Sequence, residues 1–140
     1  MPQNEVPRRV REFRLRELDN TPFGESIVEM TVTERPGPTT LVHLQGRLDA
    51  AGSDAIGLRF TTAVAGRSVS AAVDLSDVSF VASLGLRLLI LTARALAAKG
   101  HRTVLFGANE LVQGVFDDAA LDQLLPIVAT EAEALAILAT

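Results

Sequence analysis

The stretch DLSDVSFVASLGLRLL, at residues 74–89, decides how the chain folds. It overlaps the end of a largely apolar run at residues 69–74, the pattern of a short strand that is covered on both faces. Residues 75–82 then indicate a loop with apolar anchors. Beyond the loop, Lys99-Gly100 ends a series of apolar residues at helical spacing, namely Leu86, Leu89, Ile90, Ala93 and Ala97. The stretch therefore predicts a buried strand, a loop and a helix in succession.

Upstream of this stretch, the pattern indicates a hairpin and a helix. Two β-branched runs, at residues 27–32 and 39–45, flank Pro36-Gly37, and proline followed by glycine is typical of a turn. An antiparallel hairpin is therefore expected. A helix is expected at residues 52–65, because apolar residues follow one side of it and Gly66 can adopt the conformation that ends a helix.

Downstream, strand and helix patterns continue to alternate. The sequence predicts a strand at residues 103–106, a helix at 110–118, an edge strand at 124–128 and a last helix at 131–138. Pro126 is easiest to place at a sheet edge, where its missing N–H group costs nothing. The order β-β-α-β-α-β-α-β-α predicts an α/β fold, with a mainly parallel or mixed sheet of about five strands, an N-terminal hairpin and about four helices.

The first 26 residues differ from the rest in composition. They are rich in charge and contain three prolines, at positions 2, 7 and 22. We therefore expect a partly ordered N-terminal extension at residues 1–26 and one domain at residues 27–140. Val10, Phe13 and Leu18 also suggest a short amphipathic helix. A helix or strand that docks on the domain, or that pairs two copies into a homodimer, remains an open alternative.

Composition argues against several classes of function. The formal net charge of −4 argues against a nucleic-acid-binding face, and the absence of Trp and Tyr argues against a stacking platform for single strands. The absence of cysteine excludes disulfides, thiolate chemistry and Cys-based zinc sites. No apolar run approaches the ~18 residues that span a bilayer. We expect a soluble, cytoplasmic protein that binds neither nucleic acid nor membrane.

Sequence motifs for catalysis are missing as well. Neither His43 nor His101 has a second histidine or a carboxylate at metal-ligand spacing. Ser83 lacks the Gly-x-Ser-x-Gly context of a hydrolase nucleophile, and the chain has neither a Walker-type loop nor a Gly-x-Gly-x-x-Gly motif. The sequence predicts a protein that is not an enzyme and has no cofactor and no metal.

Two motifs resemble those of the STAS domain, the fold shared by anti-sigma-factor antagonists (anti-anti-sigma factors) and the cytoplasmic tails of some anion transporters. The shorter motif, Gly46-Arg-Leu-Asp49, is similar to the family's Gly-x-Leu-Asp turn. The longer one lies in the stretch quoted above and comprises Asp74-Leu75-Ser76, Phe80, Ser83, Gly85 and Leu86. The resemblance covers about residues 27–140 and implies a STAS fold.

The resemblance also implies a partner-switching cycle. Ser83 aligns with the phosphorylated serine of the bacterial antagonists. By this resemblance the chain binds an anti-sigma factor that is also an ATP-using serine kinase, and so regulates sigma-factor-dependent transcription. Phosphorylation at Ser83 would end the interaction, and a metal-dependent serine phosphatase would reverse it. Ser83 precedes the apolar helical pattern by three residues, so we also predict that it is the N-cap of that helix.

The expected partner surface comprises the 46–49 turn, the 81–85 loop and the exposed side of the following helix. Its residues are Gly46, Arg47, Asp49, Val81, Ala82, Leu84, Gly85, Arg87 and Arg94. Two of them depart from the family pattern, because Ala82 stands where the antagonists usually have Asp, and Leu84 where Ser or Ala is common. Asp49 is also a candidate cap for the first helix, and Gly85 a candidate for a position that simply requires flexible backbone.

Two other functions stay open at this point. One is a STAS scaffold module in a sensory or transport complex, without phosphorylation, in which Ser83 is a helix cap only. Ala82 and the N-terminal extension favour it. The other is a carrier of a small ligand, since related domains are reported to bind nucleotides or lipids.

Overall fold

The computed structural model describes residues 28–140, so the expectations for the N-terminal extension lie outside the described residues. Within residues 28–140, five strands form one sheet in the order β1-β2-β3-β4-β5. β1 (Glu29–Arg35) and β2 (Thr39–Leu48) form the predicted antiparallel hairpin. β3 (Ser70–Val81), β4 (Thr103–Phe106) and β5 (Ile127–Val128) follow in parallel. The predicted α/β fold with a mixed sheet is confirmed.

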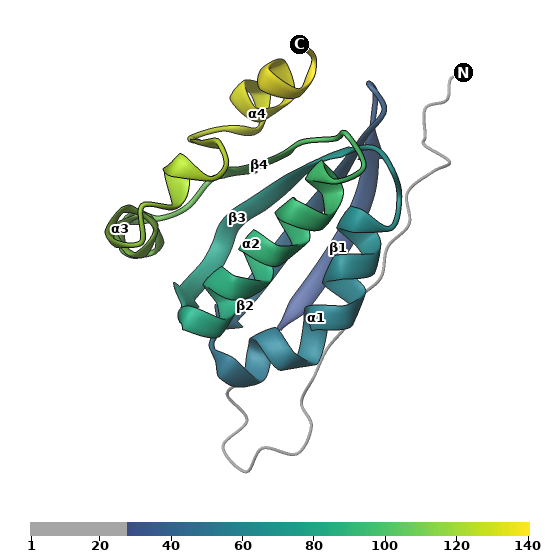
Figure 1. Cartoon of the computed structure of the whole chain (residues 1–140). Helices are drawn as coiled ribbons and strands as arrows, with labels where there is room; N and C mark the ends of the chain where they lie inside the picture. The colour runs from purple at the N-terminus through teal and green to yellow at the C-terminus, as the bar shows by residue number, and fades with distance from the viewer. Residues whose placement is uncertain (1–27) are drawn as a thin grey trace, which may run out of the picture.

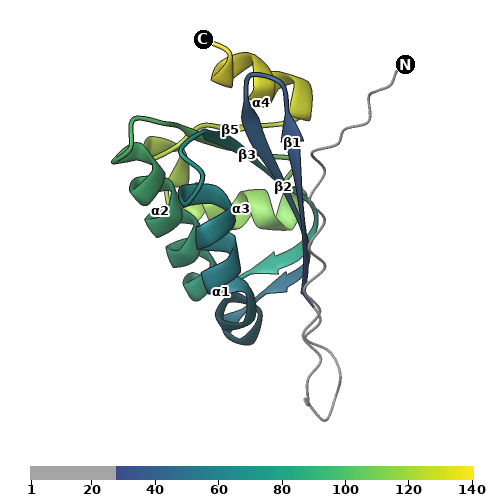
Figure 2. The same cartoon turned by 90° about the vertical axis from the view of Figure 1, so that its right-hand side faces the viewer.

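Helices cover both faces of this sheet, but unequally. α1 (Ala50–Ala65) and α2 (Ser83–Ala97) lie side by side on one face, as Figures 1 and 2 show. α3 (Glu110–Asp118) contributes Val112 and Phe116 to the same main core. The shorter α4 (Glu131–Leu138) covers the other face only near the start of the parallel strands, where Ala134 packs in a small second cluster. The outer face of the sheet is therefore only partly covered by the described helices.

The main core follows from alternation along the strands. In β2, Val42, Leu44 and Leu48 face α1 and α2 and are at most 1% exposed, whereas His43 and Gln45 face the other side. Ile56 and Phe60 of α1 belong to the same core as these strand residues and are equally buried. This packing fixes both helices along the sheet, and with them the ends from which they start.

The main departure from the sequence prediction is the length of β2 and β3. Residues 46–48 and 75–81, expected as a turn and a loop, continue the two strands and pair with each other in parallel. Two register shifts interrupt this pairing, between His43 and Gln45 and between Gly46 and Arg47. The buried residues of this part of β3 are Leu75, Val78 and Val81. These buried residues are three positions apart, because bulges interrupt the two-residue alternation of a regular strand. Sequence patterns that rely on that alternation therefore do not predict a strand here.

The other boundaries differ little. Strand 103–106 and the helices at 110–118 and 131–138 are confirmed. α1 and α2 begin earlier than the apolar pattern indicates, at Ala50 and Ser83. The expected edge strand at 124–128 is shortened to Ile127–Val128, because a 3-10 turn at Leu121–Gln123 precedes it.

Candidate functional site

The site is built where β2 and β3 end and α1 and α2 begin. Leu48 and Val81 form the last pair of the parallel ladder, and a single residue links each strand to its helix. The backbone N–H of Ala82 also donates to the carbonyl of Leu48 at 2.9 Å. Both helix N-termini therefore lie next to each other at one edge of the sheet, at the lower end of the view in Figure 1.

Ser83 is the first helical residue of α2, so the prediction that it is the N-cap is wrong. The cap position belongs to Ala82, which is extended (φ −98°, ψ 179°) and has no side chain that can accept a hydrogen bond. The side chain of Ser83 is exposed and makes no hydrogen bond with the described residues. The first turn also contains no acidic residue. The positive end of this helix is thus left without a capping side chain, directly beside the Ser83 hydroxyl.

Gly85 has a packing role that explains why the position is glycine. A Cβ atom there would lie 2.7 Å from the carbonyl oxygen of Leu48 and 3.1 Å from Cγ1 of Val81. Val81 itself is 2% exposed, and Gly85 is buried. Val81 and Gly85, two members of the expected partner surface, therefore pack inside the strand–helix junction, while Ser83 and Leu84 are exposed.

The 46–49 segment lies next to this helix end and is held by its own contacts. Asp49 caps α1, one of the two roles considered for it, by accepting a hydrogen bond from the backbone N–H of Gly52 at 2.8 Å. Its second oxygen accepts from Nε of Arg47 at 3.3 Å. The guanidinium of Arg47 also lies over the ring of Phe80, 4.6 Å from its centre, which is a cation–π geometry. The two sequence motifs therefore meet in space through these side chains.

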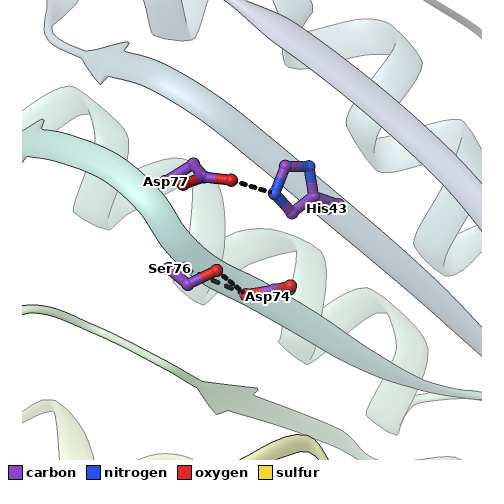
Figure 3. A network of polar contacts seen from close by, with 4 residues as sticks. All are labelled: His43, Asp74, Ser76 and Asp77. Atoms are coloured by element: carbon purple, nitrogen blue, oxygen red, sulfur yellow. Dashed lines mark hydrogen bonds and ion pairs between the residues drawn. The ribbon is translucent and has the colours of Figure 1, made fainter.

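A polar network on the outer face of the sheet explains the Asp74-Leu75-Ser76 part of the motif (Figure 3). Asp74 Oδ1 accepts hydrogen bonds from the backbone N–H and from the hydroxyl of Ser76, at 2.9 and 2.7 Å. Nearby, Nε2 of His43 and Oδ2 of Asp77 are 2.7 Å apart. These contacts flank the first register shift between β2 and β3. The His43–Asp77 contact joins β2 to β3 at this irregularity, and the Asp74–Ser76 contacts lie within β3 beside it.

Sequence reasoning missed two features of this site. One is Gly52, where a Cβ would lie 2.2 Å from the carbonyl oxygen of Arg47. The sequence does contain a signal for this close approach: Gly52 follows the cap residue of α1 by three positions, just as Gly85 follows that of α2. The other is the His43–Asp77 pair, which sequence spacing does not reveal because the two residues belong to different strands.

Residues 28–140 contain neither a cluster of metal ligands nor a membrane-spanning helix. No three His, Asp or Glu side chains in this part of the chain are grouped so that they would hold a metal ion. Among its helices, none has the length and apolar character needed to cross a membrane.

The family model of the STAS domain matches residues 29–134. The chain belongs to the STAS domain family. The match spans both motifs and all five strands, so the resemblance seen in the sequence is confirmed. No curated protein sequence matches the chain.

Solved STAS structures share the fold. An anti-sigma factor antagonist from Mycobacterium paratuberculosis has a TM-score of 0.72 and 22% identity, over 81% of this chain and 95% of that one. The antagonist SpoIIAA in its unphosphorylated form has a TM-score of 0.62 and 26% identity, over 76% of this chain and 92% of that one. Bacillus SpoIIAA in its phosphorylated form has a TM-score of 0.58 and 24% identity, over 77% and 97%.

Proposed function

We propose that this STAS protein is an anti-sigma-factor antagonist that is switched off by phosphorylation at Ser83. The unphosphorylated protein binds an anti-sigma factor, which releases a sigma factor for transcription in the bacterial cytoplasm. The anti-sigma factor is also the serine kinase that modifies Ser83, and a serine phosphatase reverses the step. ATP and the catalytic residues belong to these partners, and the chain itself acts as a binding protein.

The observation that carries the proposal is the exposed Ser83 hydroxyl at the first position of α2. The same fold is found in SpoIIAA, which has been solved in unphosphorylated and phosphorylated forms. A phosphate on Ser83 adds roughly 1.5 to 2 negative charges beside N–H groups that no side chain caps. The positive end of the helix dipole favours such a charge, so the modified protein keeps its fold.

The surface around Ser83 supports a role in binding. Leu84 is 50% exposed and Leu91 is 47% exposed, both on α2. Arg87 and Arg94 are exposed on the same helix, and neither guanidinium pairs with a described residue. A phosphate at Ser83 would change the charge of this helix end, and a total cost to the complex of only about 3 kcal/mol lowers affinity more than a hundredfold.

Intact-mass spectrometry tests the proposal directly. The protein is incubated with ATP and with the anti-sigma kinases encoded near its gene, alongside the variants Ser83→Ala and Ser79→Ala. Ser79 is a matched control because it is also exposed and lies four residues away. One added phosphate is expected in the wild type and in Ser79→Ala, and none in Ser83→Ala. A kinase that binds tightly but adds no phosphate contradicts the proposal.

Ala82 favours a second candidate, a STAS scaffold module without a phosphorylation cycle. The position next to Ser83 carries no carboxylate to orient the hydroxyl or the kinase. A scaffold predicts a stable partner complex that ATP leaves unchanged. The same mass measurement, followed by size-exclusion chromatography of the complex with and without ATP, separates the two candidates.

A further inference from the structure

A groove runs between the first halves of α1 and α2, close to Ser83. It has a volume of 210 Å³ and is lined by Ser53, Asp54, Leu84, Arg87, Leu88 and Leu91. The three leucines follow each other at the i, i+4 and i+7 positions of α2 and so form one apolar wall. Farther along the helices, the hydroxyls of Thr61 and Thr92 meet at 3.3 Å.

The charges on the two walls differ in sign. Arg87, on the α2 wall, is exposed and forms no ion pair with any residue between 28 and 140. Asp54 stands on the α1 wall, and its carboxylate makes no ion pair in that part of the chain either. A matching occupant therefore carries an apolar side chain for the leucine wall and a carboxylate on the side that faces α2. The groove therefore fits a segment of the anti-sigma partner that carries an apolar side chain and a carboxylate.

Arg87 also lies one helical turn after Ser83. Residues four apart on a helix are surface neighbours, about 5 to 6 Å apart at Cβ, so a phosphate on Ser83 is within reach of the Arg87 guanidinium. No acidic side chain of the first turn competes for it. The same guanidinium can thus serve a partner carboxylate or a phosphate of its own helix.

We propose that Arg87 couples phosphorylation to partner release: it binds a carboxylate of the partner segment in the α1–α2 groove, and phosphoserine at position 83 captures it instead. The phosphate is attached to the same helix, so its effective concentration near Arg87 exceeds that of any partner group. It also carries more charge than a carboxylate. This inference rests on the proposed function for the identity of the partner, but the contact between Arg87 and the phosphate does not.

The first experiment measures that contact without any kinase. Full-length protein with phosphoserine at position 83, introduced by genetic code expansion, is titrated by ³¹P NMR in three backgrounds: wild type, Arg87→Gln and Arg94→Gln. Arg94 is the matched control, since it is exposed on the same helix but lies eleven residues from Ser83. The phosphate should titrate at lower pH in the wild type and in Arg94→Gln than in Arg87→Gln. Equal midpoints in all three proteins would overturn the proposal.

The second experiment measures binding to the anti-sigma kinase by isothermal titration calorimetry. Arg87→Gln should weaken binding of the unphosphorylated protein about tenfold, the loss of one charge-assisted hydrogen bond. Phosphoserine should lower wild-type affinity more than about a hundredfold but lower Arg87→Gln affinity only about tenfold. If phosphoserine has its full effect in Arg87→Gln, the guanidinium is not the coupling group.

A third pair of variants tests the groove itself. Leu91→Ser should weaken kinase binding about tenfold because it removes part of the apolar wall. Leu111→Ser is the control, since Leu111 is 59% exposed but lies on α3, outside the groove. Equal losses in the two variants would contradict a groove-bound partner. A kinase that never modifies Ser83 contradicts the proposed function only, because the ³¹P measurement still reports on Arg87.

Discussion

The N-termini of α1 and α2 share the same backbone arrangement but differ in their capping residues. Each helix follows its strand after one residue, and each has a glycine in its first turn packed against the backbone at the end of β2. In α1 the cap is Asp49 and the first helical residue is Ala50; in α2 the cap is Ala82 and the first helical residue is Ser83. In α1 the polar residue occupies the cap position, where its side chain accepts a hydrogen bond from a backbone N–H of the first turn. In α2 the polar residue comes one position later, where its side chain faces solvent. The comparison separates a helix end that a side chain caps, which stabilises the fold, from one without a side-chain cap, which leaves a serine exposed.

The largest effect is expected where both ends depend on glycine. Gly52→Ala and Gly85→Ala place a Cβ 2.2 and 2.7 Å from backbone carbonyl oxygens. Each should lower the free energy of unfolding by about 2 kcal/mol or more, with Gly52→Ala the worse, because backbone cannot move aside cheaply. Urea unfolding measures this. Gly114→Ala in α3, with no atom within 4 Å of the new Cβ, should instead stabilise by about 0.5 to 1 kcal/mol. Similar values for all three variants would refute the close approach.

Removing the cap of α1 makes its end resemble that of α2. Asp49→Ala deletes the acceptor of the 2.8 Å bond from Gly52 and should cost about 1 kcal/mol of unfolding free energy. Asp49→Asn retains an acceptor at the same place and serves as the control, with a loss of only a few tenths of a kcal/mol. If Asp49→Asn is as unstable as Asp49→Ala, the Arg47 contact rather than the cap carries the stability.

Adding a cap to α2 makes its end resemble that of α1. Ala82 already has the extended conformation of a cap residue, so Ala82→Asp should raise the unfolding free energy by about 0.5 to 1 kcal/mol. It also places a carboxylate beside the Ser83 hydroxyl, and under the proposed function the rate of phosphate addition at Ser83 should rise. Thermal unfolding and timed mass spectrometry measure the two effects. Ala82→Gly, which changes stability by a few tenths of a kcal/mol, is the control; a rate increase in both variants would exclude a role for the carboxylate.

The smallest effect is expected at Ser83 itself. Its hydroxyl bonds no described residue, and alanine is the better helix former, so Ser83→Ala should change stability by no more than about 0.5 kcal/mol. Chemical denaturation checks this. A loss near 1 kcal/mol would mean that the hydroxyl does cap α2, and the difference between the two helix ends would disappear.

The sequence predicts the regular parts of the fold well. The helices at 110–118 and 131–138 begin after Asn109 and Thr130, whose side chains accept hydrogen bonds from the first turn, a signal that is local and legible. The second half of β3 was not predictable in this way. Its pairing depends on register shifts against β2, which lies about 30 residues away in the chain and leaves no mark in the local pattern.

The candidate site was predictable in membership but not in geometry. The family motif pointed to Ser83, Gly85 and residues 46–49, and these do lie together. Which of them reach the surface depends on one-residue differences in where α2 starts, and local propensity does not resolve such differences. The pairing of Arg47 with Phe80, and the groove that Leu88 shares with α1, arise only from tertiary packing.

The one-residue connections on either side of the site have a consequence for recognition. Ser83 lies between the end of a strand and the start of a helix, not in a flexible loop. A protein that binds here therefore causes little loss of backbone conformational entropy in this chain. Under the proposed function, the kinase would have to accept this serine in helical backbone geometry and would recognise a surface assembled from β2, β3 and both helices. A free peptide with the sequence of residues 74–89 would lack that surface and should be a much poorer kinase substrate than the folded domain.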